Sequence, residues 1–256
     1  MLFRSWRMGD DPLDSSTLIK DVVGGNDFTL NAMVASDITN NPAKLARDLK
    51  NGNDGNFINF GETVNINDVW EFDGVNDYID FGDNDAFSFG DSSTDSPFSI
   101  DMWVNMTDAT KFRMVSKSGV TTREYYINTS SGDFLFFVLF DNTGGNYRYI
   151  SSNETMTQYE GQWINIVGTY DGRGGTNAND GLNLYLNGSL MAFTKASAGT
   201  YVAMHNTTEP LLIGRFTETN DYANGQISNV KIYNRALTTQ EIKDNYNALK
   251  SRFGIR

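Results

Sequence analysis

The sequence predicts an all-β protein, a two-sheet antiparallel β-sandwich that carries one amphipathic helix at its C-terminal end. Three observations lead to this prediction. Strand signals recur about every ten to fifteen residues, with clusters of turn-forming residues between them. The composition combines 24 glycines and 13% aromatic residues with only four prolines, which is typical of many short strands joined by tight turns. Helical periodicity is well developed in one stretch, near the C-terminus.

The predicted strands follow from alternation of apolar and polar residues, which places every second side chain on one face of a sheet. A strand is predicted over residues 98–106, within which residues 99–105 alternate strictly. Residues 182–187 also alternate and then turn at Asn187-Gly188, the commonest two-residue hairpin signal. Residues 134–140 are nearly all apolar, which predicts a central strand buried on both faces. The remaining predicted strands are 2–8, 27–34, 69–72, 77–81, 112–117, 123–128, 146–152, 163–170, 190–195, 210–215 and 226–233.

The terminal helix is predicted over residues 239–252. Thr238 and Glu241 have the spacing of a capping box, in which each side chain bonds the backbone of the other residue. Gly254 follows at the position where a helix commonly ends in the left-handed conformation. Apolar residues recur along one helical face, which predicts that the helix lies on the sandwich; they are Ile242, Tyr246, Leu249 and Phe253.

The chain of 256 residues shows no change in composition that would mark a second domain, so one domain is predicted over residues 1–256. Residues 35–56 are polar and without periodicity, and a long irregular loop is predicted there. The sequence has no cysteine, which excludes disulfides and cysteine-ligated zinc. A domain of this size buries a large core without such cross-links.

The charge balance excludes several partners. Lys and Arg total 20 and Asp and Glu total 32, for a formal net charge of −12. Nucleic acids and anionic lipid surfaces repel such a chain, so no nucleic-acid binding is predicted. No apolar stretch is long enough to span a bilayer, so no membrane insertion is predicted either. An acidic chain does suit divalent cations.

Six motifs occur in order along the chain, at residues 72–80, 97–104, 163–172, 184–188, 212–215 and 221–237. In their order and spacing they resemble the laminin-G-like jelly-roll family, whose fold is concanavalin A-like. The free-standing members that this chain resembles are structural proteins of bacteriophages and marine viruses. The resemblance covers nearly the whole chain and implies a jelly-roll sandwich. Four aromatic residues in these motifs are interpreted as packing residues and not as sugar platforms, namely Trp103, Trp163, Tyr170 and Tyr233.

No catalytic residue is predicted, and the protein is predicted not to be an enzyme. Catalytic relatives of this sandwich resemble one another in a Glu-x-Asp-x-Glu strand, and that pattern is absent here. The closest acidic run is Asp77, Asp80 and Asp83, whose spacing of three sends successive carboxylates to opposite faces of a strand. These residues are interpreted as strand ends and turns. His205 is the only histidine and is interpreted as a polar loop residue.

A structural calcium ion is the one cofactor that the sequence suggests. Calcium takes six to eight oxygen ligands from carboxylates, amides and backbone carbonyls in irregular loops, and relatives that resemble this chain often hold one near such loops. The alternative is that these side chains merely satisfy the turns in which they lie. The candidate ligands are Asp21, Asn26 and Asp27 in one loop, and Asp171, Asn177, Asn179 and Asp180 in another.

Read as a complete chain that starts at its own Met1 without a leader, the sequence suits a protein that assembles inside a host cell. The first functional hypothesis is therefore a non-enzymatic virion structural or surface protein, such as a head decoration, fibre or tail-associated protein. Its expected partners are other virion proteins, further copies of itself and host-surface glycans, and its expected location is the virion. The alternatives are a cellular carbohydrate-binding lectin module, outside the cell or on its surface, and a polysaccharide hydrolase or lyase.

Overall fold

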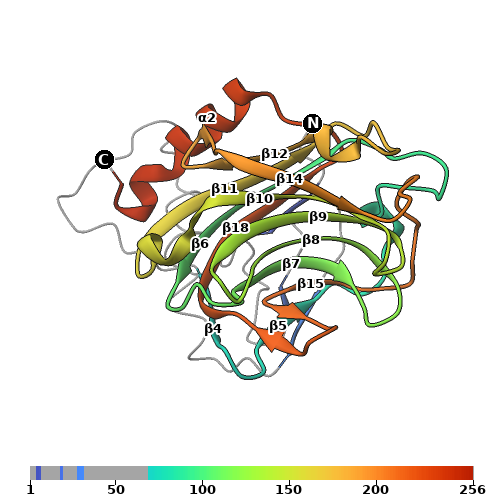
Figure 1. Ribbon diagram of the computed structural model, residues 1–256. Helices are drawn as coiled ribbons and strands as arrows, with labels where there is room; N and C mark the ends of the chain where they lie inside the picture. Colours follow the sequence, from blue (N-terminus) through green and yellow to red (C-terminus); the bar gives the residue numbers. More distant parts are fainter. Residues whose placement is uncertain (1–3, 7–17, 20–27, 32–68, 256) are drawn as a thin grey trace, which may run out of the picture.

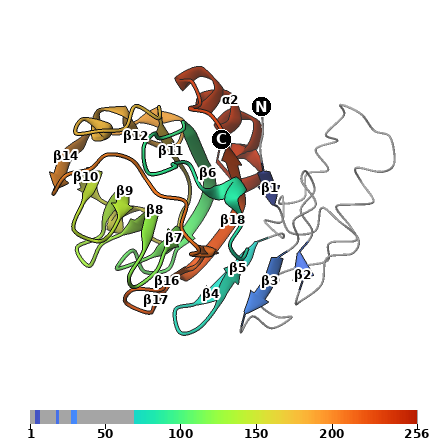
Figure 2. The same ribbon diagram turned by 90° about the vertical axis from the view of Figure 1, so that its right-hand side faces the viewer.

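The computed structural model describes residues 4–6, 18–19, 28–31 and 69–255, and the side chains of 69–255. These residues form two antiparallel sheets packed face to face, with one helix near the C-terminus (Figures 1 and 2). The predicted sandwich with a terminal helix is therefore confirmed. The predicted loop 35–56 lies outside the described residues. No helix among the described residues is long and apolar enough to cross a membrane.

One sheet has seven strands in the order β1-β18-β6-β11-β12-β13, with β4 pairing to β18 as well. Its central strand pair is β6 and β11, which are joined over eight residue pairs in register, from Trp163↔Asn105 to Tyr170↔Phe98. The bounds are β1 Arg4–Trp6, β4 Trp70–Asp73, β6 Phe98–Met106, β11 Trp163–Tyr170, β12 Leu182–Leu186, β13 Ser189–Leu190 and β18 Asn224–Tyr233.

The second sheet has nine strands in the order β14-β10-β9-β8-β7-β15-β5-β3-β2. A short hairpin of β16 (Arg215–Phe216) and β17 (Asp221–Tyr222) follows β15. The bounds are β2 Leu18–Ile19, β3 Phe28–Asn31, β5 Tyr78–Asp80, β7 Arg113–Ser118, β8 Arg123–Thr129, β9 Phe134–Asn142, β10 Tyr147–Thr155, β14 Phe193–Ala198 and β15 Leu211–Ile213.

Local signals in the sequence placed most strands correctly. The predicted strands 98–106 and 163–170 coincide with β6 and β11. The predicted turn at Asn187-Gly188 joins β12 to β13, and both residues have the positive φ, 50° and 77°, that this turn requires. The predicted strand 210–215 is interrupted at Gly214, whose φ of 85° breaks it into β15 and β16.

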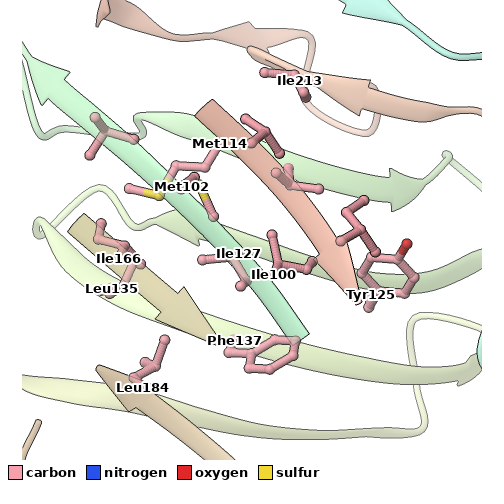
Figure 3. Packing of buried hydrophobic residues seen from close by; sticks show 14 of the residues in the cluster. Ile100, Met102, Met114, Tyr125, Ile127, Leu135, Phe137, Ile166, Leu184 and Ile213 are labelled. Atoms are coloured by element: carbon pink, nitrogen blue, oxygen red, sulfur yellow. The ribbon is translucent and has the colours of Figure 1, made fainter. Parts of the chain in front are cut away.

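The core lies between the two sheets and is filled by the inward-facing side chains of both (Figure 3). The seven-stranded sheet contributes Ile100 and Met102 of β6, and the nine-stranded sheet contributes Ile127 and Phe137, all fully buried. Gly168 of β11 belongs to this interface, because a Cβ there would lie 2.5 Å from the Ile127 side chain. Burial of each large apolar side chain contributes about 1.5–3 kcal/mol to stability.

The outer face of the seven-stranded sheet is covered by the C-terminal helix. Helix α2 spans Thr239–Leu249 and continues as the 3₁₀ helix η4, Lys250–Phe253. The predicted apolar face docks as expected, with Ile242 and Phe253 buried. The helix explains why β6 is buried on both faces, since Trp103 on its outer face is fully buried beneath the helix.

Both ends of the helix follow the prediction. The Thr238 hydroxyl accepts a hydrogen bond from the Glu241 backbone N–H at 3.3 Å, and the Glu241 carboxylate accepts one from the Thr238 backbone N–H at 2.9 Å. This is a complete capping box. Gly254 ends the helical segment in the left-handed conformation, with φ of 73°.

Strand β9 corrects one prediction. Leu135 and Phe137 enter the core as expected, but Phe134 is 37% exposed and Phe136 is only partly buried. The near-continuous apolar run therefore does not mean burial on both faces at this end of the strand. Here the outward-facing Phe134 and Phe136 lie on the outer surface of the nine-stranded sheet.

Candidate functional site

Aromatic side chains from three adjacent strands meet on the outer face of the nine-stranded sheet. Strand alternation turns Phe136 and Phe140 of β9 away from the core. The strand register places Phe140 opposite Tyr147 of β10, and it places Val138, on the same face of β9, between Tyr149 of β10 and Tyr126 of β8. These residues form the outer-face aromatic patch, defined as Tyr126, Phe136, Phe140, Tyr147 and Tyr149.

The patch is continuous from ring to ring. Ring centroids lie 5.3 Å apart for Phe136 and Tyr149, 5.8 Å for Tyr149 and Tyr147, 5.8 Å for Tyr147 and Phe140, and 5.7 Å for Phe140 and Tyr126. These separations are typical of favourable aromatic pairs. Phe140 is buried beneath its neighbours, whereas the other four rings are partly exposed. The patch therefore presents aromatic surface that is held in place by its own packing.

The β16–β17 hairpin borders the patch at Tyr126. The ring of Phe216 in this hairpin lies 5.1 Å from that of Tyr126. Arg113 lies over the Phe216 ring, and one of its Nη atoms pairs with Asp221 at 2.6 Å. The hairpin is thereby fixed against β7, and it brings charged groups to the border of the patch.

A second arginine borders the patch on β8. Arg123 lies over the Phe140 ring at 5.4 Å and pairs with Glu218 of the hairpin at 2.6 Å. Burial raises the pKa of Tyr126 to about 12; the Glu218 carboxylate adds to the rise, and Arg113 and Arg123 oppose it. The Tyr126 hydroxyl therefore keeps its proton at neutral pH. Among the described residues it has no hydrogen-bond partner, so it is a donor available to a ligand.

This patch was not predicted from the sequence, because its members come from separate strands. The available signal was the even spacing of aromatic residues within each strand, which puts them on one face: Phe136 and Phe140 in β9 are four residues apart, and Tyr147 and Tyr149 in β10 are two apart. The four aromatic residues that were interpreted as packing residues do lie in the structural interior. Trp103, Trp163, Tyr170 and Tyr233 are between 0% and 8% exposed.

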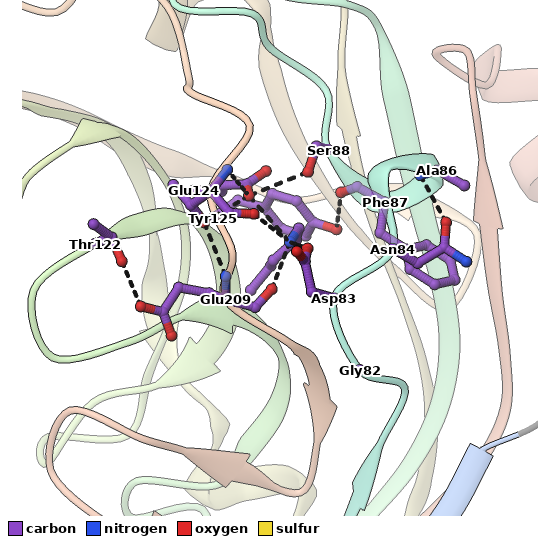
Figure 4. A network of polar contacts seen from close by, with 12 residues as sticks. Gly82, Asp83, Asn84, Ala86, Phe87, Ser88, Thr122, Glu124, Tyr125 and Glu209 are labelled. Atoms are coloured by element: carbon purple, nitrogen blue, oxygen red, sulfur yellow. Dashed lines mark hydrogen bonds and ion pairs between the residues drawn. The ribbon is translucent and has the colours of Figure 1, made fainter.

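A separate buried polar cluster lies near the ends of β7 and β8 (Figure 4). Lys117 and Glu124, both without exposed side-chain surface, form an ion pair at 3.1 Å. The Glu124 Oε1 atom also accepts hydrogen bonds from Ser88 Oγ and from the backbone N–H and hydroxyl of Thr207. Asp83 lies 3.2 Å from Lys117 Nζ. This cluster ties the segment before β15 to the sheet.

Local hydrogen bonds account for two of the three aspartates in the predicted acidic run, Asp77 and Asp80. Asp77 accepts a hydrogen bond from the Asp73 backbone N–H at 3.0 Å, and Asp80 accepts one from that of Gly82 at 2.7 Å. These are turn contacts, as predicted. His205 lies in a loop and contacts Asp141 at 3.0 Å.

Four candidate calcium ligands fall within the described residues, in the connection between β11 and β12. The Asp171 carboxylate pairs with Arg173 at 2.6 Å, and the Asp180 carboxylate pairs with Lys195 at 3.0 Å. Asn179 donates to the Ala196 carbonyl, and Asn177 precedes the 3₁₀ helix η3, Ala178–Gly181. The two carboxylates point to different cations, and no cluster of three acidic, histidine or cysteine side chains suited to a metal occurs in the described part of the chain. Asp21, Asn26 and Asp27 lie outside the described residues.

A two-sheet antiparallel sandwich with these motifs is of the concanavalin A-like class. The family model of the concanavalin A-like lectin/glucanases superfamily matches residues 72–243. The chain therefore belongs to this superfamily. Among curated proteins, none matches the chain.

Similar solved structures include binding domains of clostridial toxins. The botulinum neurotoxin serotype G binding domain has a TM-score of 0.61 at 16% identity, covering 98% of this chain and 52% of that one. The binding domain of Paraclostridial Mosquitocidal Protein 1 has 0.59 at 17%, covering 99% and 55%. The botulinum neurotoxin DC binding domain, solved in complex with SialylT, has 0.58 at 13%, covering 97% and 51%. The chain thus spans about half the length of these proteins, and the likeness shows a shared fold.

Proposed function

We propose that this domain binds glycans through the outer-face aromatic patch. The observation that carries the proposal is the continuous set of rings on β8, β9 and β10, four of them partly exposed. A sugar ring has an apolar face of C–H groups and a rim of hydroxyls, so it suits a site with aromatic surface and a few polar groups at its edge. Membership in a lectin/glucanase superfamily supports this choice of ligand.

The polar groups at the border of the patch suit sugar hydroxyls. The Tyr126 hydroxyl is an unused donor, and the nearby Glu218 carboxylate, exposed on the hairpin and held by Arg123, is an acceptor. Sialylated or otherwise acidic sugars are included in the proposal, because a structurally similar toxin domain was solved with SialylT and the partly exposed Arg123 lies over the Phe140 ring of the patch.

We further propose that binding is not followed by cleavage. Glycoside hydrolysis needs two carboxyl groups with separate roles on either side of the scissile bond. The sequence contains no Glu-x-Asp-x-Glu strand. The two carboxylates at the border of the patch, Glu218 and Asp221, are each engaged by an arginine. Incubation with β-glucans, agars and alginates should release no reducing ends, and turnover lost on substitution of one Asp or Glu would reverse this proposal.

The test of glycan binding is a glycan array followed by calorimetry with the best ligand. Tyr149→Ala should weaken binding by at least about fivefold, because truncation of a central aromatic contact typically costs more than about 1 kcal/mol. Tyr126→Phe removes only a hydroxyl and should weaken binding by about threefold to tenfold, the equivalent of one hydrogen bond. Leu190→Ala is the control, since Leu190 is 55% exposed on β13 of the other sheet. Equal affinity in all three variants would place the ligand elsewhere.

The virion is the setting that we propose for this activity. A single patch of this size binds weakly, and a particle that displays many copies gains avidity without new contacts. Self-association or docking on a larger shell is therefore expected, and analytical sedimentation of the protein with its neighbouring gene products tests it. A strict monomer that binds a soluble oligosaccharide tightly would favour the cellular lectin module instead.

A further inference from the structure

Lysine, aspartate and glutamate side chains meet in the buried cluster of Figure 4 in an arrangement suited to forming a covalent bond. Lys117 Nζ lies 3.2 Å from Asp83 Oδ1 and 3.1 Å from Glu124 Oε1. We propose that Lys117 and Asp83 condense to an intramolecular amide, and that Glu124 carries the proton in this step. The modification would be autocatalytic and would need no cofactor.

The backbone holds the two reacting groups in place. The Phe81 N–H donates to the Leu211 carbonyl at 3.0 Å, and the Leu211 N–H donates to the Gly82 carbonyl at 3.1 Å. These bonds fix the chain immediately before Asp83 against β15. Lys117 lies on β7, on the other side of β15. Two groups held in contact in this way can react as fast as if one of them were present at an effective concentration of about 10⁵–10⁸ M.

The lysine amine is held equally closely. Besides the two carboxylates, the Lys117 Nζ donates to the backbone carbonyl of Glu209 at 2.5 Å and to that of Thr207 at 3.4 Å. The Lys117 side chain has no exposed surface. Four oxygen partners therefore hold the buried amine beside the Asp83 carboxyl.

Glu124 has the properties that a proton carrier needs here. Three donor groups besides Lys117 converge on its Oε1 atom, whereas Oε2 is buried and has no hydrogen-bond partner among the described residues. Burial raises the pKa of Glu124, although the nearby Lys117 opposes this rise. A proton that leaves the attacking nitrogen therefore has the Oε1 atom at 3.1 Å to receive it, and no donor among the described residues competes for Oε2.

The step balances without an oxidant or a co-reactant. Lys117 gives one proton to the Asp83 carboxylate, with which it is paired at 3.2 Å; this frees the lone pair on Nζ and leaves Asp83 as the neutral acid. The Nζ atom then attacks the Asp83 Cγ atom. Glu124 takes a second proton from the nitrogen and delivers it to the departing oxygen, so that one N–C bond forms, one C–O bond breaks and one water leaves. Asp83 is 36% exposed, which gives that water a route to solvent.

The consequence is a covalent bridge across the nine-stranded sheet. It would join β7 to the segment that follows β5, spanning β15, which pairs with both strands. A chain without cysteine would thereby gain a cross-link that does not depend on redox conditions and that shortens a loop of the unfolded chain.

The experiment is intact-mass spectrometry of the full chain under denaturing conditions, followed by proteolysis and peptide mapping. The expected result is a mass lower than that of the sequence by one water, with the Lys117 peptide joined to the Asp83 peptide. The pair Lys195 and Asp180, 3.0 Å apart but exposed, is the internal control and should appear as two separate peptides. A folded chain of full mass would overturn the proposal.

Variants separate the chemistry from folding. Glu124→Gln keeps the size of the proton carrier and removes its carboxylate, so the cross-link should disappear and the full mass should return. Asp83→Asn keeps an electrophile and should give the same amide with loss of ammonia in place of water. A cross-link that persists in Glu124→Gln would refute the role of Glu124. If Glu124→Gln fails to fold, the masses of the wild-type chain and of Asp83→Asn still show whether the amide forms.

Discussion

Trp103 of β6 and Phe253 of η4 stack with their ring centroids 4.1 Å apart and their planes 13° from parallel. Trp163 of β11 lies 4.8 Å from the same phenylalanine. The last helical turn of the chain is therefore packed on the centre of the seven-stranded sheet. This contact buries an indole that would otherwise face solvent, which makes the C-terminal segment part of the packed structure.

Truncation of this contact should be strongly destabilising. We expect Phe253→Ala to lower the free energy of unfolding by about 3–5 kcal/mol, because Phe253 is 4% exposed and its loss leaves a cavity over Trp103. Denaturant titration with tryptophan fluorescence measures this change. Asn247→Ala, on the exposed face of the same helix, should change stability by less than about 0.5 kcal/mol. Equal stability of all three chains would mean that the segment is a tether for a partner.

The helix cap gives a smaller and independent prediction. Thr238→Ala removes the hydroxyl that accepts from the Glu241 N–H and should cost about 1 kcal/mol. Chemical denaturation measures the loss, and Lys243→Ala, in the exposed middle of α2, is the matched control. A loss of stability no larger than that of Lys243→Ala would show that water fully replaces the capping hydroxyl.

Glu241 predicts a dependence of stability on pH. The hydrogen bond from Arg235, and then those from Thr238, lower the pKa of this carboxyl from 4.5 to about 2. Because the folded state has the lower pKa, the stabilisation is present above pH 4.5 and is lost as the pH falls toward 2. Wild type should therefore melt at a higher temperature than Glu241→Gln near pH 6, and this difference should shrink between about pH 4.5 and pH 2. A difference that stays constant across that range would contradict the assignment.

Strand β9 offers a matched pair of substitutions. Leu135 is fully buried and Phe134, its neighbour, is 37% exposed. Leu135→Asp should prevent folding, since an unpaired buried charge is very costly, whereas Phe134→Asp should give a soluble, cooperatively melting protein. Circular dichroism and thermal melting distinguish the two outcomes. Folding of both variants would contradict the burial of Leu135 in the core.

Calcium binding remains a prediction that thermal melting can test. An ion that binds only the folded state adds RT ln(1 + [L]/Kd) to its stability, so a bound structural calcium should make EDTA lower the melting temperature. At the β11–β12 connection, calcium would have to displace Arg173 from Asp171 and Lys195 from Asp180. Asp171→Asn should remove any calcium effect that arises there. Identical melting curves in EDTA and in millimolar calcium would exclude the ion.

The elements that the sequence predicted are those whose signals are local. A capping box such as Thr238 with Glu241 lies within one helical turn, and the Asn187-Gly188 turn is set by the φ angles of two adjacent residues. Strand β6 is predicted because alternation along a single strand selects its inward face. These features depend on neighbours in the chain, so one sequence is sufficient to find them.

The sites depend on contacts between residues that are far apart in the chain, and only the tertiary structure decided them. Tyr126 and Tyr149 reach one patch because strand register aligns β8, β9 and β10. Lys117 and Asp83 meet because β15, which comes much later in the chain, lies between their strands. The sequence by itself determined the fold class, the terminal helix and most strands. The packing of the two sheets decided which polar and aromatic side chains meet, because inter-strand register is a property of the assembled sheet and not of any one strand.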